Sequence, residues 1–197
     1  MDLSVFDTIA RQNTWGSTES ISGPGSTLGA TATLRKGLAE AFRVLEVRSL
    51  VDAPCGDLNW MRHVQFPFEK YIGIDIVPSV IDRLKAEAFP PGYHFQVGNI
   101  VTDILPVADA LLCRDCLVHL PFAAIMEAAR LWKAAGFRFV LATTFTEHGN
   151  EDCAPGGWRP LNLQAAPFNW PAPDMLIPDN DGLGPPFNDK SLGIWRY

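Results

Sequence analysis

The sequence predicts an α/β protein in which helices cover both faces of a mostly parallel, doubly wound β-sheet. Three observations predict this fold class. Between residues 30 and 145, short apolar runs alternate with segments in which apolar residues recur at helical spacing. Several of these short runs are apolar at nearly every position, as expected for parallel strands that are buried on both faces. The chain has 197 residues, 47% of them hydrophobic, which suits one domain with its own core.

The first half of this alternating region contains two expected helices. Leu34 and Leu38 lie at helical spacing and belong to a helix expected over residues 30–45. A second helix is bounded by Pro78, which suits a helix start, and by Pro90, which a helix cannot pass. The other elements expected here are a short helix at 59–64 and strands at 50–53, 71–74 and 94–97.

The second half contains a helix between two strongly apolar strands. The elements expected here are strands at 108–113 and 137–143 and an amphipathic helix at 122–135. Gly136 is expected to end this helix, because glycine readily adopts the left-handed conformation of a helix C-terminus. The chain then becomes rich in Pro, Gly, Asn and Trp, which predicts a long loop over 147–173. Two short runs, 174–178 and 192–196, are expected to form antiparallel strands at the edge of the sheet.

Composition restricts the possible partners of the protein. The net charge is −6 and no cluster of Lys and Arg stands out, which argues against duplex nucleic acid as the main partner. No apolar run reaches the roughly 18–20 residues that span a bilayer, and the N-terminus lacks the pattern of a signal peptide. Four cysteines in a chain of this length suggest reduced thiols. We therefore expect a cytoplasmic protein with no nucleic-acid or membrane partner.

Cys113 and Cys116 have the spacing of a Cys-x-x-Cys motif. A structural zinc site needs a second pair of ligands at similar spacing, and the sequence contains none. We therefore interpret the two thiols as part of a strand end and expect no bound metal.

The segment 49–57 is the most informative stretch of the chain. A short apolar run ends at Asp52 and turns through Pro54, Cys55 and Gly56 into a polar stretch. This is how the first strand of an α/β sheet meets a nucleotide-like ligand at its carboxyl end.

A second acid, Asp75, ends the next apolar run. An acid at the tip of the second strand is commonly the acceptor for the two ribose hydroxyls of a nucleotide-like ligand. The first turn lacks the Gly-x-Gly-x-x-Gly pattern that seats a pyrophosphate on a helix N-terminus. The pattern therefore disfavours a dinucleotide such as NAD.

Over residues 48–145 the chain resembles the class I S-adenosylmethionine-dependent methyltransferases. In that family the first strand ends in acid-x-Gly-x-Gly. Here Asp52 occupies the acid position, Pro54 replaces the first glycine and Gly56 keeps the second. The Pro-Cys-Gly-Asp form is similar to one that some methyltransferases of this fold carry. The resemblance implies a Rossmann-like fold and S-adenosylmethionine as the cofactor.

The resemblance also assigns cofactor-binding roles. Gly56, in the turn with Pro54 and Cys55, allows close approach of the methionine portion, whose ammonium group Asp52 and Asp57 would receive. Either acid could instead cap a turn or a helix. Asp75 would accept the ribose hydroxyls.

Other residues would surround the adenine and the reacting sulfonium. Ile76 and Ile100 would flank the adenine ring, although both could equally be core residues. Asn99 stands where the family often has an acid that contacts the adenine amino group. Arg114 lies in the loop that lines the sulfonium in this family, and Trp15 belongs to an N-terminal segment expected to cover the cofactor.

Catalytic candidates follow the fourth and fifth strands, where α/β ligands bind. If the acceptor is a hydroxyl, a general base is needed, and His119, His148 and Asp115 are the candidates. His119 could alternatively cap the following helix. The long loop after the fifth strand offers residues that could hold an acceptor: Asn150, Asp152, Trp158, Arg159 and Trp170.

These observations predict one methyltransferase domain over residues 1–197. It comprises an N-terminal lid (1–28), a cofactor-binding core (29–146) and an acceptor loop with closing strands (147–197). The predicted function is methyl transfer to a small molecule, at a hydroxyl of a carbohydrate or secondary metabolite. A protein that binds S-adenosylmethionine without catalysis is the alternative, and an NAD-binding oxidoreductase is a weaker one. A homodimer is left open as the assembly.

Overall fold

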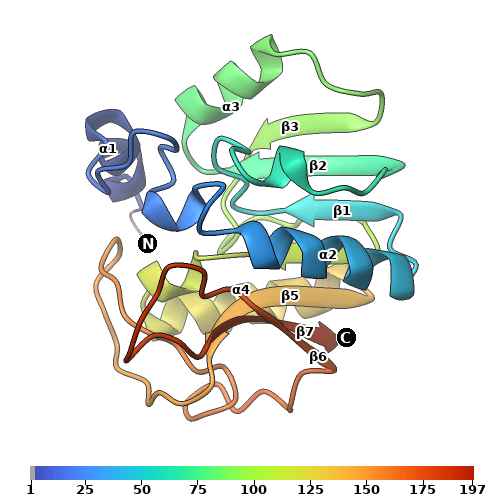
Figure 1. Ribbon diagram of the computed structural model, residues 1–197. Coiled ribbons are helices and arrows are strands. Elements are labelled where there is room, and N and C mark those ends of the chain that lie inside the picture. The colour runs from blue at the N-terminus through green and yellow to red at the C-terminus, as the bar shows by residue number, and fades with distance from the viewer. Residues whose placement is uncertain (1–2) are drawn as a thin grey trace.

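The computed structural model describes residues 3–197 and contains one seven-stranded sheet (Figure 1). The strands are β1 (Ser49–Asp52), β2 (Lys70–Asp75), β3 (Tyr93–Val97), β4 (Ala110–Cys113), β5 (Phe139–Phe145), β6 (Met175–Pro178) and β7 (Lys190–Arg196). Their order in the sheet is β3-β2-β1-β4-β5-β7-β6. The first five strands pair in parallel, whereas β7 runs antiparallel to both β5 and β6. The predicted mostly parallel sheet with antiparallel C-terminal pairing is confirmed.

Helices cover both faces of this sheet. The long helices are α1 (Val5–Gln12), α2 (Ala32–Val44), α3 (Pro78–Ala86) and α4 (Phe122–Ala135). Apolar side chains of α2 and α3 pack in one hydrophobic cluster, and those of α4 pack in a second cluster. Successive strand residues alternate between the two: Leu50 points into the first cluster and Val51 into the second. The doubly wound arrangement is therefore confirmed.

One predicted helix differs from the structure, and two predicted helix ends agree with it. The expected helix at 59–64 is only a 3₁₀ turn at Met61–His63, and it follows Leu58, whose left-handed φ of 55° is not helical. Pro78 begins α3 as predicted, and Gly136 ends α4 with a φ of 76°. Helix α1 was not predicted, because residues 1–28 were interpreted as a polar, glycine-rich lid; the first two of those residues lie outside the described part.

The loop after β5 has neither helix nor strand between residues 146 and 174, as predicted. It is nonetheless well anchored. Leu161 and Leu163 are fully buried in the cluster that contains α4, and Trp170 packs edge-on against Trp195 of β7. The loop therefore covers part of the same face of the sheet as α4.

Within residues 3–197, none of the helices has both the length and the apolar composition needed to cross a bilayer.

Candidate active site

One deep pocket lies at the carboxyl edge of the sheet, where the strand order reverses between β1 and β4. Its volume is about 1020 Å³, measured out to open solvent. In Figure 1 this edge is the side on which α1 lies. The pocket is lined by Leu3, Phe6, Ala10, Trp15, Ile21, Ser22, Ser26, Asp52, Pro54, Cys55, Gly56, Trp60, Asp75, Ile76, Val77, Val80, Gly98, Asn99, Ile100, Arg114, Asp115, Cys116, His119 and Leu120.

The turn after β1 is joined directly to the tip of β2. The Gly56 amide donates to Asp75 Oδ2 at 3.0 Å, and the Val77 amide donates to Asp75 Oδ1 at 3.0 Å. Burial raises the pKa of Asp75, and these backbone hydrogen bonds oppose the rise. Each carboxylate oxygen can accept a second hydrogen bond, so Asp75 can still hold a ligand diol.

Glycine suits position 56 of this turn. Its φ is 54°, and a Cβ placed on it would lie 2.1 Å from Ser22 Oγ. A side chain at this position would therefore displace the Ser22 hydroxyl, whereas glycine lets the turn and the N-terminal segment pack closely at the pocket.

Asp52 lies at the end of β1 and is buried. Desolvation raises its pKa to about 7, although the hydrogen bond from the Tyr71 hydroxyl lowers it; Asp75 raises it further and Arg114 lowers it. Asp52 lines the pocket as predicted, but in the protein alone this carboxyl is half protonated near neutral pH.

Asp52 should make the protein less stable as the pH rises. Between the ordinary aspartate pKa of about 3.9 and the folded value near 7, the folded state keeps a proton that the unfolded state has released. Stability is therefore lost as the pH rises through this window. Between about pH 4 and pH 8, we expect the wild type to lose about 2–4 kcal/mol more than Asp52→Asn in urea unfolding. Parallel pH profiles for the two proteins would contradict this expectation.

The predicted adenine-binding residues meet at the tips of β2 and β3. Ile76, Asn99 and Ile100 all line the pocket. Asn99 Oδ1 accepts from the Val101 amide at 2.9 Å, and Asp103 Oδ2 accepts from the Asn99 amide at 2.8 Å. The Asn99 side-chain amide thus remains a donor for a ligand.

Asp57 differs from its predicted role. It does not line the pocket; its carboxylate accepts from Ser20 Oγ at 2.9 Å and from the Ile21 amide at 2.9 Å. A carboxylate bound in this way anchors the N-terminal segment over the first turn instead of receiving a ligand ammonium group.

Trp15 was predicted to cover the cofactor, and it lines the pocket. Its indole stacks on the His119 ring with centroids 5.1 Å apart. Gly23 leaves room for it, since a Cβ there would be 3.1 Å from Trp15 Cβ. The N-terminal segment therefore closes the His119 end of the pocket.

A cluster of four charged residues lies behind the β4 tip. Arg114 pairs with Asp179 through two hydrogen bonds of 2.8 and 2.9 Å, and Lys190 Nζ lies 2.7 Å from Asp115 and 3.1 Å from Asp179. The Arg114 side chain is 4% exposed and that of Asp179 is 0% exposed. We call Arg114, Asp115, Asp179 and Lys190 the charge cluster.

The charge cluster balances two cations against two anions, and it reaches the N-terminal segment. Arg114 Nη2 donates to the Gly25 carbonyl at 2.8 Å, and its guanidinium lies 5.1 Å from the ring of Trp60. Burial would raise the pKa of Asp115, but Arg114 and Lys190 outweigh it and hold that pKa well below its usual range. Asp115 is therefore an anchored carboxylate and not a base at neutral pH.

His119 is the best-placed candidate base. Its Nδ1 lies 2.7 Å from the Gly157 carbonyl, which can only accept, so Nδ1 carries the proton and Nε2 keeps a lone pair. Burial lowers the pKa of His119, while Asp115 raises it. The neutral imidazole lines the pocket next to Asp115 and Cys116.

His148, the other histidine candidate, does not line the pocket. Its Nδ1 lies 3.1 Å from Asp189 Oδ2, and its ring stacks on Phe187. The prediction that it acts at the reacting atoms is therefore not supported by its position.

The predicted acceptor residues hold the long loop together instead of lining the pocket. Asn150 donates to the carbonyls of Asn162 and Ala166, and Asp152 accepts from the Phe122 amide at the start of α4. Trp170 packs against β7, as described above. Each polar group is used locally because a loop without secondary structure must satisfy its own backbone.

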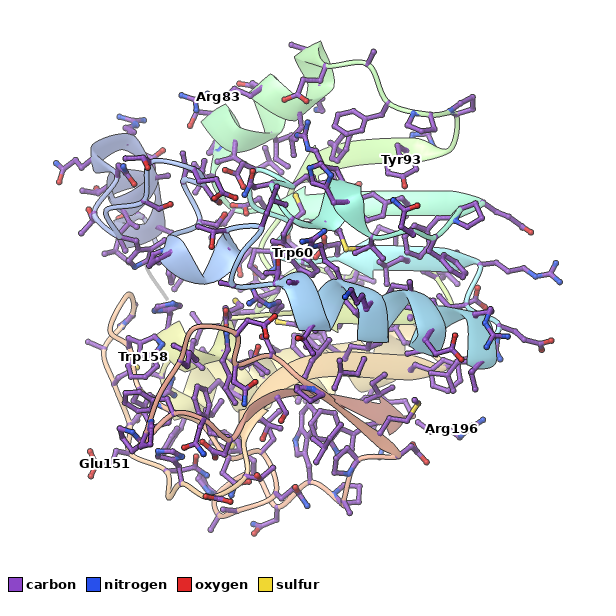
Figure 2. The ribbon with its side chains drawn as sticks, in the orientation of Figure 1. Trp60, Arg83, Tyr93, Glu151, Trp158 and Arg196 are labelled. Carbon is purple, nitrogen blue, oxygen red and sulfur yellow. The ribbon has the colours of Figure 1, made fainter. Side chains whose placement is uncertain are left out.

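Arg159 and Trp158 also lie outside the pocket lining. Arg159 is buried and donates to backbone carbonyls, whereas Trp158 is 50% exposed beside Phe145 and Phe187. Figure 2 shows Trp158 and Glu151 on the side of the molecule where α1 lies. Of the five predicted acceptor residues, Asp152 and Trp158 are exposed.

Several pocket residues were missed from the sequence. Leu3, Phe6 and Ala10 face the pocket from α1 and its N-terminal approach, and their helical spacing could have revealed this element. Trp60, at the centre of Figure 2, had no such signal, because the turn before it is irregular. Cys116 was considered only as half of a Cys-x-x-Cys spacing. Among residues 3–197, no group of three or more His, Cys, Asp or Glu side chains is arranged to hold a metal ion.

The strand order, the single reversed strand β7 and the pocket at the switch point define the fold of the class I methyltransferases. Solved structures with this fold superpose on the chain. The methyltransferase domain of bacterial CtHen1 has 14% identity and a TM-score of 0.63, covering 85% of this chain and 100% of that one. PigF with SAH has 12% identity and a TM-score of 0.61, covering 85% and 55%.

A third structure is magnesium protoporphyrin IX methyltransferase from Synechocystis PCC 6803 with bound SAH. It has 12% identity and a TM-score of 0.54, covering 74% of this chain and 69% of that one. Neither protein-family models nor curated protein sequences gave a match. At these identities the comparison establishes the shared fold.

Proposed function

We propose that the protein is an S-adenosylmethionine-dependent methyltransferase that acts on a small molecule. The observation that carries this proposal is the joined pair of Gly56 and Asp75 at the floor of the pocket. Gly56 and Ser22 pack closely at the pocket wall, and Asp75 offers carboxylate oxygens beside them. These features suit a nucleoside with a free diol, and the sheet is that of class I methyltransferases.

The pocket residues divide into two sets of roles. Asp75 would hold the ribose, with Ile76, Ile100 and Asn99 around the adenine; Asp52 would face the methionine portion, whose ammonium group favours its ionised form. When bound, S-adenosylmethionine supplies an electrophilic methyl group on a sulfonium.

The reaction would be an in-line displacement. Asp75 and Asp52 would hold the methyl donor, which would supply both the electrophilic carbon and the leaving group for attack by the acceptor oxygen. His119 Nε2 takes the acceptor proton. Holding the acceptor beside the methyl group supplies most of the acceleration, because that electrophile is already reactive.

The acceptor is proposed to be a neutral small molecule with a hydroxyl group. Asp75 and the ionised fraction of Asp52 give the pocket an acidic character that disfavours anions, whereas the charge of Asp115 is balanced by Arg114 and Lys190. Leu3, Phe6 and other apolar side chains supply its walls, so a secondary metabolite suits it better than a bare carbohydrate. In this proposal residues 1–28 act as the lid and 29–146 hold the cofactor, whereas the segment 147–197 contributes through the contact of Gly157 with His119.

Calorimetric titration with S-adenosylhomocysteine tests the cofactor. We expect micromolar binding to the wild type, weakened at least about tenfold in Asp75→Ala, which is about 1.4 kcal/mol. Asp82→Ala, an exposed acid on α3, is the matched control and should bind as the wild type does. Binding of NAD(H) in place of S-adenosylhomocysteine would overturn the proposal.

A protein that binds the cofactor without catalysis remains the second candidate. His148 bonds to Asp189 away from the pocket, and Asn150 bonds to the backbone of its own loop. Both observations favour this second candidate. Incubation with labelled S-adenosylmethionine and a panel of neutral hydroxylated acceptors separates the two. Tight S-adenosylhomocysteine binding with no methylated product from any acceptor would support the second candidate.

A further inference from the structure

Arg159 ties two segments of chain together at the catalytic end of the pocket. Its Nη1 donates to the Leu117 carbonyl at 2.7 Å and its Nη2 donates to the Leu120 carbonyl at 2.6 Å. Its Nε donates to the Glu151 carbonyl at 3.1 Å. Leu117 and Leu120 lie on either side of His119, so the planar guanidinium spans the turn that carries this histidine.

The segment before Arg159 makes three more hydrogen bonds with the same turn. The Gly157 carbonyl accepts from His119 Nδ1, and the Gly156 amide donates to the His119 carbonyl at 3.0 Å. The Arg159 amide donates to the Val118 carbonyl at 3.3 Å. The imidazole tautomer therefore depends on how segment 156–159 sits against the turn.

The charges around His119 act on the same ring. Besides burial, the positive charges of Arg159 and Lys190 lower the pKa of His119, and the negative charge of Asp115 raises it. Trp15 stacks on the ring and adds no charge. Burial lowers the pKa of Arg159 and the nearby charge of Asp152 opposes this, but within residues 3–197 the Arg159 guanidinium donates to backbone carbonyls and forms no ion pair with a carboxylate.

We propose that Arg159 is a positioning residue that holds His119 as a neutral base, with its Nε2 lone pair available to the pocket. This inference rests on the proposed function, in which His119 takes the acceptor proton. Arg159 thus acts through the backbone of the turn and of Gly157, and it does not contact the acceptor itself.

Imidazole ¹⁵N NMR tests this inference without an acceptor. The chain has four histidines, and His119→Asn assigns the resonance. In the wild type we expect the Nδ1–H tautomer and titration below the ordinary value of about 6.5. Arg159→Met should give a mixed tautomer and a pKa that rises toward the ordinary value. Arg159→Lys should restore part of the wild-type signature, since an ammonium keeps the charge but lacks the planar fork.

Controls separate positioning from general damage. Arg130→Met removes an exposed arginine on α4 and should leave the His119 resonances unchanged. If Arg159→Met does not fold, Arg159→Lys carries the test. A folded Arg159 variant with the wild-type tautomer and pKa at His119 would overturn the inference.

Activity separates this inference from the proposed function. With a productive acceptor, Arg159→Lys should lower kcat by about tenfold while changing the KM for S-adenosylmethionine by less than about twofold. The acid limb of its pH–rate profile should also move with the His119 titration. If the Arg159 variants alter the His119 NMR signals but methyl transfer does not need His119, Arg159 still positions His119. The proposal that His119 is the base would then be refuted.

Discussion

Replacing Arg114 with methionine is expected to destabilise the protein by about 3–5 kcal/mol, because it leaves a buried carboxylate without its main partner. Asp179 is 0% exposed and receives two hydrogen bonds from Arg114, which leaves only Lys190 as a cation after the substitution. The charge cluster then changes from neutral to a net charge of −1. Urea unfolding followed by tryptophan fluorescence measures the loss.

Two further variants show whether burial is the cause. Arg138→Met breaks the exposed pair with Asp109 and should cost about 0–1 kcal/mol. Arg114→Met combined with Asp179→Asn removes one charge of each sign and should recover about 0.5–3 kcal/mol relative to the sum of the single variants. A loss for Arg114→Met no greater than that for Arg138→Met would show that the cluster contributes little to stability.

Removing the proposed base, His119, is expected to have the largest effect on catalysis. His119→Asn should lower the rate of methyl transfer to a hydroxyl by about 10²–10⁴-fold, because positioned general bases contribute that much. Its S-adenosylhomocysteine affinity should stay within about twofold of the wild type, because Asp75 and the Gly56 turn are unchanged. Steady-state rates combined with calorimetry measure both quantities.

The pH dependence of the methyl-transfer rate is a second test of His119. Burial lowers the pKa of His119, so the imidazole stays neutral to a lower pH than a free histidine does. The wild-type rate should therefore fall only as the pH drops below the ordinary value of about 6.5. His94→Asn, on the exposed edge of β3, is the control and should keep both rate and profile. Full activity in His119→Asn would eliminate this residue as the base.

The fold was predictable because its signals are local. Strands such as β4 and β5 are buried at every position, and their apolar runs therefore stand out in the chain. Pro78 and Gly136 mark helix ends through backbone geometry that depends on few neighbours. The short helix α1 was missed because glycines and polar residues dominate the segment around it.

The candidate site was predictable only in part. Asp52, Gly56 and Asp75 follow strands in the sequence, and parallel strands bring their carboxyl ends to one edge. The roles of Asp57 and Arg159 depended on partners 36 to 42 positions away in the chain, such as Ile21 and Leu117. Side-chain type did not distinguish a ligand-binding carboxylate from one that anchors a loop.

The sequence by itself therefore determined the sheet, the order of its elements and the pair of acids at two strand tips, because periodicity and turn residues act over short distances. Only the tertiary structure decided which polar groups remain available to a ligand. Trp15 stacks on His119, Arg114 pairs with Asp179, and Asn150 of the acceptor loop donates to the backbone of the same loop. Those pairings arise because each buried polar group must find a partner wherever the packed chain provides one.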